Sequence, residues 1–457
     1  MTRMRYVGVM LLALGCTSGG GGAADAGRTS LSVEELMDPV TCAGCHAEHY
    51  REWSGSMHAY AARDPVFLAM NRRGQEATNG ALGDFCIRCH APLAVALGAT
   101  TDGLNAAELP EHLQGVTCFY CHSVVGVEGT HNNPLRLSMD GIMRGGFRNP
   151  VANPAHRAEY SALHARDSVE SATLCGSCHD IVTPRNVELE RTFKEWQHSI
   201  YSRPPSEGGL TCNACHMDGR NAPAATGGPT RRTHSHAWPG VDVALTEFPN
   251  REEQRAQVQR MLDSTLLSEL CVYREGGVVD IQVTLENIAA GHAFPSGAAQ
   301  DRRVWVEVKA YRGEELAYSS GVLPPHGDIT RSGDENLWLM RDWLYDEADA
   351  PTHLFWEAAR YDSVLMPAPT ALLPSDPGWT QTHRTRAYVY AGEQPDRVEL
   401  AVHVQPMGAD VLAELVSTGY LERAVMAEMP VFTLAAASLT WRAEEGLQCV
   451  GATPRRP

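Results

Sequence analysis

Lysine, aromatic residues and long apolar segments are all scarce in this chain of 457 residues. Its only lysines are Lys194 and Lys309, its aromatic content is 7% and its formal net charge is −17. This acidic balance argues against nucleic acid and anionic lipid surfaces as partners, because both carry negative charge. No segment beyond the N-terminus is long and apolar enough to cross a membrane as a helix.

Cysteine is scarce outside one repeated pattern. Ten of the thirteen cysteines belong to five Cys-x-x-Cys-His motifs, formed by Cys42, Cys45 and His46; Cys86, Cys89 and His90; Cys118, Cys121 and His122; Cys175, Cys178 and His179; and Cys212, Cys215 and His216. The two thiols add to the vinyl groups of a haem and the histidine ligates its iron, so the pattern predicts five covalently bound haem c groups. Disulfides or zinc sites are the alternatives, but zinc does not require a histidine directly after each second cysteine.

The N-terminus predicts export. A short basic region precedes an apolar run from Tyr6 to Leu14, which is too short for a membrane span and typical of a signal peptide over residues 1–15. The segment from Ala13 to Cys16 resembles a bacterial lipobox, so Cys16 is the predicted lipidation site and residues 16–39 a flexible, lipid-anchored tether. An ordinary cleaved signal peptide is the alternative. Either reading places the protein in the periplasm or, as a lipoprotein, at the outer membrane.

Residues 40–243 contain all five motifs but lack the long periodic apolar runs that an ordinary core requires. The segment is instead rich in glycine, proline, histidine and alanine. We therefore expect the haems themselves to form the core of a pentahaem cytochrome domain, with short helices and loops wrapped around them. Several of the motifs should open a helix.

The pattern changes in the second half of the chain. Residues 244–270 are predicted to be a helical connector, with a polar amphipathic helix from Arg251 to Leu267. Apolar and polar residues then alternate around Val279–Leu285, Val304–Val308 and Val398–Val404. This period of two is typical of half-buried antiparallel strands and predicts a β-sandwich over residues 271–450. The predicted fold class is therefore multi-domain α+β, a haem-cored helical domain followed by an antiparallel sandwich.

Cys271 and Cys449 are the remaining cysteines downstream of Cys16, and they bracket the predicted sandwich almost end to end. In an oxidising compartment they are expected to form a disulfide that closes the domain. Two free buried thiols are the alternative.

The sixth ligand of each iron decides what the iron can do. A second histidine saturates the iron and leaves electron transfer, whereas an open position permits substrate binding. The candidate distal ligands are His58, His131, His156, His234, His236 and His292. Methionine is the alternative ligand type, and the available residues are Met57, Met70, Met139, Met143 and Met217.

A partial internal repeat predicts that one iron differs from the others. The segment Trp53–His58 after the first motif is similar to Trp196–Tyr201 after the fourth, so Tyr201 stands where His58 stands. Unless the nearby His198 replaces it, the fourth unit has no distal histidine there. The fourth haem is therefore the expected place for an open site.

The motifs and their surroundings resemble the cytochrome c-552/c-554 type of bacterial multihaem cytochromes over about residues 40–240. The features that carry the resemblance are Cys42–His46 followed by Trp53–His58, Gly115–His122 followed by His131, Leu174–Asp180, and Thr211–Met217. The resemblance implies a mainly helical fold, closely stacked haem pairs and electron transfer between extracytoplasmic partners. The second half resembles, more weakly, immunoglobulin-like domains appended to such cytochromes.

The main functional hypothesis is an extracytoplasmic electron-transfer cytochrome that binds five haem c groups and exchanges electrons with redox partner proteins, of which basic ones suit its charge. Its only membrane contact would be the lipid anchor, and nucleic acid is excluded as a partner. A multihaem redox enzyme with one open haem, a small-oxyanion reductase or a peroxidase, is the alternative. No catalytic residue is assigned. Every motif ends in histidine, so the Cys-x-x-Cys-Lys haem of pentahaem nitrite reductases is not supported.

Overall fold

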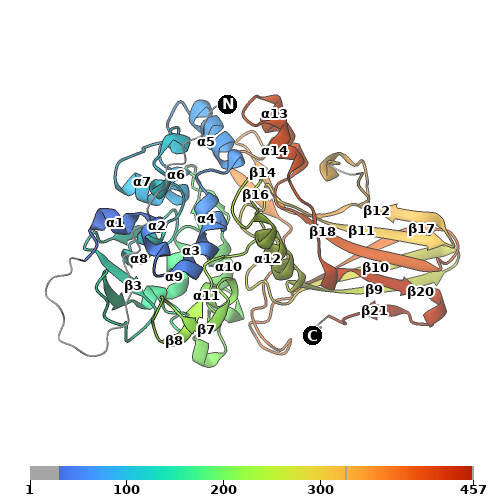
Figure 1. Cartoon of the computed structure of the whole chain (residues 1–457). Coiled ribbons are helices and arrows are strands. Elements are labelled where there is room, and N and C mark those ends of the chain that lie inside the picture. Colours follow the sequence, from blue (N-terminus) through green and yellow to red (C-terminus); the bar gives the residue numbers. More distant parts are fainter. Residues whose placement is uncertain (1–29, 325–326, 455–457) are drawn as a thin grey trace, which may run out of the picture.

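A computed structural model describes residues 30–324 and 327–454 of the chain. The predicted signal peptide, Cys16 and most of the tether lie outside these residues. Figure 1 shows a helical half (residues 30–243) beside an elongated β half (residues 264–454), with α12 (Arg251–Asp263) between them. Within the described ranges, no helix has the length and apolar character needed to span a membrane. The predicted α+β class is confirmed.

The helical half is built from short helices. They are α1 (Val33–Met37), α2 (Pro39–Ala43), α3 (Ala47–Ser54), α4 (Met57–Tyr60), α5 (Pro65–Ala77), α6 (Ile87–His90), α7 (Pro92–Ala96), α8 (Cys118–His122), α9 (Ser171–Gly176), α10 (Thr192–Gln197) and α11 (Cys212–His216). Several begin at recognisable signals. Ser32 and Glu35 form a capping box on α1, and Asp64 caps α5 ahead of Pro65.

Four pairs of short strands connect these helices. The antiparallel pairs are β1 (Val124–Val127) with β2 (Leu135–Leu137), β5 (Ile181–Val182) with β6 (Glu188–Leu189), and β7 (Gly219–Pro223) with β8 (Thr230–His234), whereas β3 (Ile142–Gly145) and β4 (Arg157–Tyr160) run parallel. His156 directly precedes β4 and His236 lies two residues after β8, so these strand pairs position both histidines.

The β half contains two antiparallel sheets. One has the order β17 (His383–Ala391), β10 (Val278–Asn287), β9 (Leu266–Glu275), β21 (Cys449–Gly451). The other is built on β12 (Glu315–Ser320), β11 (Arg303–Arg312), β18 (Arg397–Gln405) and β19 (Phe432–Thr433), with β13 (Trp338–Met340) and β20 (Leu439–Arg442) pairing to β11 and β18. A small third sheet joins β14 (Asp342–Tyr345), β15 (Pro351–Thr352) and β16 (Arg360–Ser363), and two helices, α13 (Ala409–Ser417) and α14 (Arg423–Ala427), follow β18.

The alternating apolar residues face the space between the two large sheets, as the sequence pattern predicts. Val279, Ile281, Val283 and Leu285 on β10 are all fully buried, as are Val304, Val306 and Val308 on β11. They belong to one apolar cluster with β18, which shows that the sheets pack face to face. The same cluster includes Val66 and Met70 of α5, so the core continues across the boundary between the two halves.

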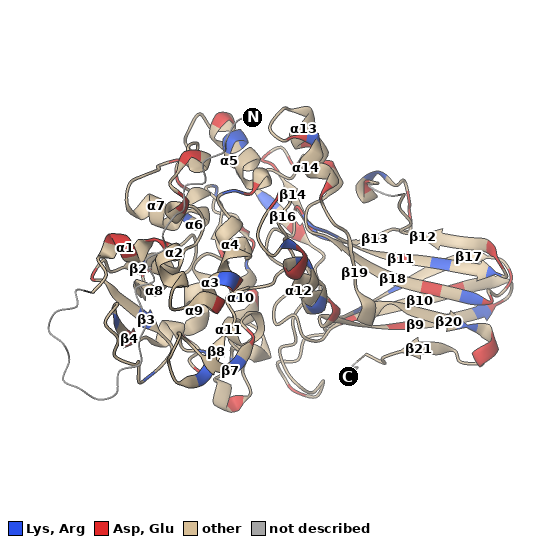
Figure 2. Ribbon diagram, in the orientation of Figure 1, with Lys and Arg blue, Asp and Glu red and all other residues tan. Residues whose placement is uncertain are grey.

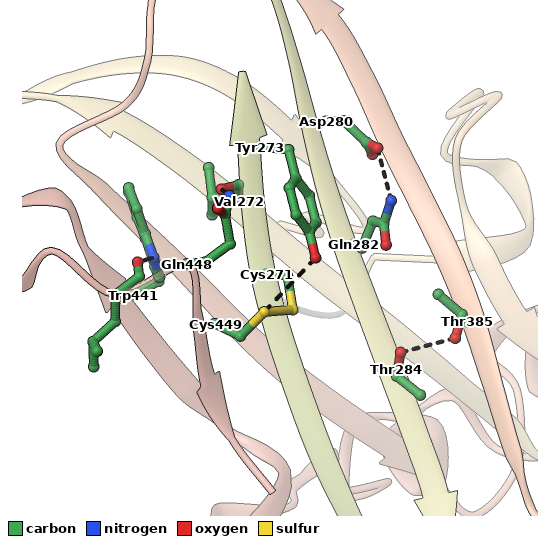
Figure 3. Close-up of a disulfide and its surroundings, with 11 residues drawn as sticks. Cys271, Val272, Tyr273, Asp280, Gln282, Thr284, Thr385, Trp441, Gln448 and Cys449 are labelled. Atoms are coloured by element: carbon green, nitrogen blue, oxygen red, sulfur yellow. Dashed lines mark hydrogen bonds between the residues drawn. A yellow bond between two sulfur atoms is a disulfide. The ribbon is translucent and has the colours of Figure 1, made fainter. Parts of the chain in front are cut away.

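Cys271 and Cys449 form a disulfide between β9 and β21 (Figure 3). The two residues are direct partners in the strand register, so the bond ties the C-terminal edge strand to its neighbour. The connector differs from its prediction at one end. Its helix ends at Asp263, and Leu266 already begins β9, because the segment after Ser264 pairs with β10 rather than continuing the helix.

Candidate haem-binding site

Each Cys-x-x-Cys-His motif forms about one turn of helix. The third and fifth motifs make up α8 and α11 and the second lies on α6, whereas the first runs from the end of α2 to the residue before α3 and the fourth begins in the last two residues of α9. The backbone N–H of His46 donates to the carbonyl of Cys42 at 2.8 Å, and that of His179 donates to Cys175 at 3.1 Å. Because residues three and four apart share one helix face, both thiols and the imidazole project to the same side.

All five motifs open onto one cavity of about 3170 Å³, lined by all ten motif cysteines and all five motif histidines. An ordinary small-molecule pocket holds about 300–1000 Å³. A space several times larger, with thiols and imidazoles around it, fits several macrocycles in contact. The cavity thus stands where the sequence predicts a core made of cofactor.

The motif histidines are oriented by backbone carbonyls. Nδ1 of His46 lies 2.7 Å from the carbonyl of Ala224, Nδ1 of His216 lies 2.7 Å from that of Pro239, and His90 and His122 make the same kind of contact with Ala61 and Arg144. A proton on Nδ1 that donates to a carbonyl leaves Nε2 as the free lone pair. Four of the five proximal imidazoles are therefore held in the tautomer that ligates a metal.

Four motif histidines face a second histidine. The ring centroids are 6.3 Å apart for His46 and His156, 6.3 Å for His179 and His58, 6.4 Å for His122 and His236, and 6.5 Å for His216 and His292. A metal–imidazole bond is about 2 Å long and its nitrogen lies roughly 1 Å from the ring centre, so two imidazoles on one iron have centroids about 6 to 6.5 Å apart. The four pairs match that separation.

The facing histidines are also held for ligation. Nδ1 of His156, His236 and His292 contacts the carbonyls of Arg157, His234 and Ala293 at 2.8–3.0 Å. His236 is fixed further by its backbone N–H, which donates to the buried carboxylate of Glu52 at 2.9 Å.

Burial keeps the two imidazoles of the His58–His179 pair neutral. It lowers the pKa of His58 to about 3 and that of His179 to about 4, and each neighbouring imidazole adds to the shift. A neutral imidazole is the form that binds a metal. His58 and His179 are therefore in the protonation state that ligation requires.

His90 differs from the other four motif histidines. Among the described residues, no imidazole stands opposite its ring at the separation found in the four pairs. Its ring instead stacks on Phe67, with centroids 3.9 Å apart and planes 6° from parallel. The second motif is therefore the one that the described chain leaves without a distal histidine.

The fourth motif, for which the sequence predicted an open haem, does have a facing histidine. His58 faces His179, and the Tyr201 hydroxyl donates to the carbonyl of Ile288 at 2.9 Å, which uses it to hold the two halves together. His198 is exposed and does not line the cavity. The repeat that related Tyr201 to His58 is local, whereas the ligand comes from a distant segment.

Two other distal candidates are not paired. His131 lies outside the cavity lining, and its Nδ1 contacts Thr130 at 2.9 Å. His234 lines the cavity with a buried Nδ1 that has no hydrogen-bond partner, but it faces no motif histidine. Of the five methionines named as alternatives, all but the exposed Met139 line the cavity.

Two cavity histidines were missed by the sequence analysis. His49 follows His46 by one turn of α3, so the two rings share one side and do not oppose each other across a metal. His164 stacks on His122 at 5.4 Å, but its Nε2 contacts the carbonyl of Cys121 at 2.8 Å. Spacing along the helix marks His49, whereas no sequence signal marks His164.

The cavity also offers partners for the propionate groups of haem. Arg148, Arg166, Arg231 and Arg232 line it, and within the described ranges none of the four forms an ion pair with a carboxylate. Nη1 of Arg166 is buried without a hydrogen-bond partner. Guanidinium groups left unpaired in so acidic a chain fit carboxylates supplied by the cofactor. The residues present therefore fit haem c at the thiols, the imidazoles and the arginines.

Cysteines of different motifs adjoin inside the cavity. The sulfurs of Cys42 and Cys118, of Cys89 and Cys178, and of Cys175 and Cys212 are neighbours in pairs. Cys121 lies close enough to Cys175 for the two thiols to interact electrostatically. The attachment points of all five motifs therefore form one connected set.

Comparisons with known proteins agree with this geometry. Residues 41–123 match the family model for cytochrome c554 and c-prime. The crystal structure of a penta-heme cytochrome c552 from Thermochromatium tepidum matches with a TM-score of 0.58 and 21% sequence identity, over 91% of this chain and 99% of that chain. No curated protein matches the sequence. The resemblance expected from the motifs is confirmed, and the match, the fold and the five motifs around one cavity support a multihaem c-type cytochrome with haem c as its cofactor.

Proposed function

We propose that this chain is an extracytoplasmic pentahaem c-type cytochrome that passes single electrons between redox partner proteins. The observation that carries the proposal is the second imidazole facing the motif histidine in four of the five units. When bound, each haem iron supplies one-electron redox chemistry, and two imidazole ligands leave it no open position for substrate. The protein's contribution is to hold, orient and space these ligands.

The connected cysteines support transfer through the whole cavity. Cys42 and Cys118 join the first and third motifs, and the thiols of the fourth motif adjoin those of the second, third and fifth. The cysteines of this connected set differ in their exposure to solvent. Cys215 of the fifth motif is exposed, whereas the other motif cysteines are half-buried, so the fifth motif is the proposed point of contact with a partner.

The location and the partner follow from the sequence. Covalent haem attachment and the predicted signal peptide support export, and Cys16 supports a lipid anchor in the periplasm or at the outer membrane. Lys and Arg are interspersed with Asp and Glu over both halves (Figure 2). With a net charge of −17, the surface suits a basic redox partner.

The test combines haem counting with spin state. Pyridine haemochrome assay should give five haems per chain, and low-temperature EPR of the oxidised protein should show low-spin ferric signals from at least four. Replacing His58, His156, His236 or His292 by alanine should each convert one haem to a high-spin form. A haem count well away from five, or high-spin signals from several motifs in the unmodified protein, would overturn the proposal.

A second candidate function is catalysis or ligand binding at one open haem, and the isolation of His90 favours it. The expected signature is a single high-spin ferric component in the unmodified protein that cyanide converts to low spin. Each of the four alanine variants should then add a second high-spin component. Five low-spin signals that do not respond to cyanide would exclude this function.

A further inference from the structure

The fifth motif receives its facing histidine from the other half of the molecule. His292 lies in the loop of residues 288–302 between β10 and β11, and its ring faces His216 with planes 9° apart. The other three facing histidines, His58, His156 and His236, all belong to the helical half. Only this pair therefore depends on how the two halves are docked.

A carboxylate of the helical half accepts hydrogen bonds from the loop beside His292. Oε2 of Glu195, on α10, accepts the backbone N–H of Ala293 at 3.1 Å and the hydroxyl of Ser296 at 2.7 Å. Ala293 follows His292 directly, and its carbonyl contacts Nδ1 of the His292 ring at 2.8 Å. Glu195 thus binds the backbone N–H of the same residue whose carbonyl orients the imidazole.

A second α10 residue grips the same loop. Oγ1 of Thr192 lies 2.7 Å from the hydroxyl of Ser296 and accepts the backbone N–H of Gly297 at 3.0 Å. Thr192 and Glu195 are three residues apart, which places both on one face of the helix. α10 therefore makes four hydrogen bonds to the loop between Ala293 and Gly297 through two side chains.

An ion pair between Arg302, at the end of the loop, and Asp242 of the helical half is a second attachment. Arg302 binds Asp242 with two hydrogen bonds of 3.0 Å, and its Nε donates to the carbonyl of Ser296 at 2.8 Å. Asp242 lies three residues after Pro239, whose carbonyl orients His216. One short segment of the helical half is therefore tied to both facing imidazoles.

We propose that Glu195 and Thr192 are positioning residues for the sixth ligand of the fifth haem, so that docking of the β half completes the iron site. This inference rests on the proposed function, which makes His292 the ligand opposite His216. Hydrogen bonds to a carboxylate are stronger than neutral ones, and they confine His292 to one position. The β half is then a structural part of the haem site, and movement of the loop away from α10 would open that iron.

The experiment compares variants of the full-length protein carrying its haems. Glu195→Ala should produce a high-spin, cyanide-binding ferric component equal to one haem, with the same signal as His292→Ala. Glu195→Gln keeps an acceptor oxygen and should produce a smaller fraction of that component. Ser296→Ala and Thr192→Val each remove part of the grip, so they supply milder changes should the Glu195 variants fold poorly.

Tyr420→Phe is the matched control. The hydroxyl of Tyr420, which follows α13, donates to Oε2 of Glu76 on α5 at 2.6 Å, and this contact crosses between the same two halves away from the loop. This variant should weaken docking elsewhere and leave every haem low-spin. If it produces the same high-spin signal, then general loosening of the interface, and not positioning by Glu195 and Thr192, explains the effect and the inference is wrong.

The remaining outcomes distinguish a failure of this inference from a failure of the proposed function. If His292→Ala gives the high-spin component but a Glu195→Ala, Thr192→Val double variant stays entirely low-spin, the positioning role is refuted and His292 remains the ligand. If His292→Ala itself changes nothing, His292 is not a ligand and both the pairing and the inference fail. In that case the other three alanine variants still test the electron-transfer proposal.

Discussion

A chain made without covalent haem attachment should lose its helical half and keep its β half. The helical half encloses a cavity of about 3170 Å³ lined by the haem-binding motifs. The β half has its own apolar core between two sheets, where Ile281, Leu285 and Val306 are fully buried. The helical half has a smaller apolar cluster around Ile87, Leu93 and Phe119, but only this half has the cofactor cavity in its interior.

The volume of the cavity determines the free-energy cost of leaving it empty. Empty space in a protein core costs about 24 cal/mol per Å³, so about 3170 Å³ would cost on the order of 76 kcal/mol. A domain is stable by only about 5–15 kcal/mol. Water can enter much of an open cavity, but even a tenth of the volume left dry would cost about 8 kcal/mol, as much as the whole stability of a domain.

The assay is limited proteolysis with mass spectrometry, on chains produced with and without the haem-attachment machinery. The haem-free chain should yield a protected fragment that begins near α12 and should lose most of its helical circular dichroism. The same chain carrying its haems should resist cleavage throughout. A haem-free chain whose residues 30–243 resist protease and keep their helical signal would refute the reasoning, because the apolar cluster of the helical half would then be sufficient without the haems.

Three further outcomes are expected. Reducing the Cys271–Cys449 bond should lower the free energy of unfolding of the β half by up to about 5 kcal/mol, the chain-entropy value for a crosslink spanning 178 residues, which denaturant titration with and without reductant would measure. Gly176→Ala would push a methyl group into the Phe193 ring and should destabilise the holoprotein by about 1–3 kcal/mol in thermal unfolding, whereas Gly44→Ala, whose added Cβ has its nearest neighbour 3.9 Å away, should be close to neutral. Burial lowers the pKa of His353, but contact with Asp301 and Glu414 outweighs burial and raises it. This contact should therefore stabilise the β half fully below about pH 6.5, and the stabilisation should be lost as the pH rises through the raised pKa. His353→Gln should flatten that dependence in thermal melts at pH 5.5 to 8.5.

The attachment motifs and the strands could be predicted because each is encoded locally. A thiol, a second thiol three residues on and the next residue's imidazole share one helical face, and this needs no distant contact. The strands β10, β11 and β18 alternate with a period of two, and their apolar residues are buried as that pattern requires. The end of the connector helix was misplaced for a related reason, since Leu266 continues the helical pattern but pairs with β10.

The facing histidines could be named but not assigned. His58 faces the fourth motif, His156 the first, His236 the third and His292 the fifth. Only the pairing of His292 with the fifth motif follows the order of the sequence, and His156 reaches back past two motifs to the first. Proximity along the chain therefore favoured His131, which lies just after the third motif but outside the cavity lining.

The same reason explains why the sequence predicted no facing histidine for the fourth motif. The comparison of Tyr201 with His58 assumed that each motif draws its ligand from the segment that follows it. In the structure the segment after the first motif serves the fourth, so a missing histidine after the fourth motif says nothing about the fourth iron. His90 has no facing histidine because no histidine-bearing loop of the described chain passes opposite its ring, whose face is instead stacked on Phe67. When the cofactors make the core, the chain winds around them, and the ligand of each iron is set by which loop passes over it.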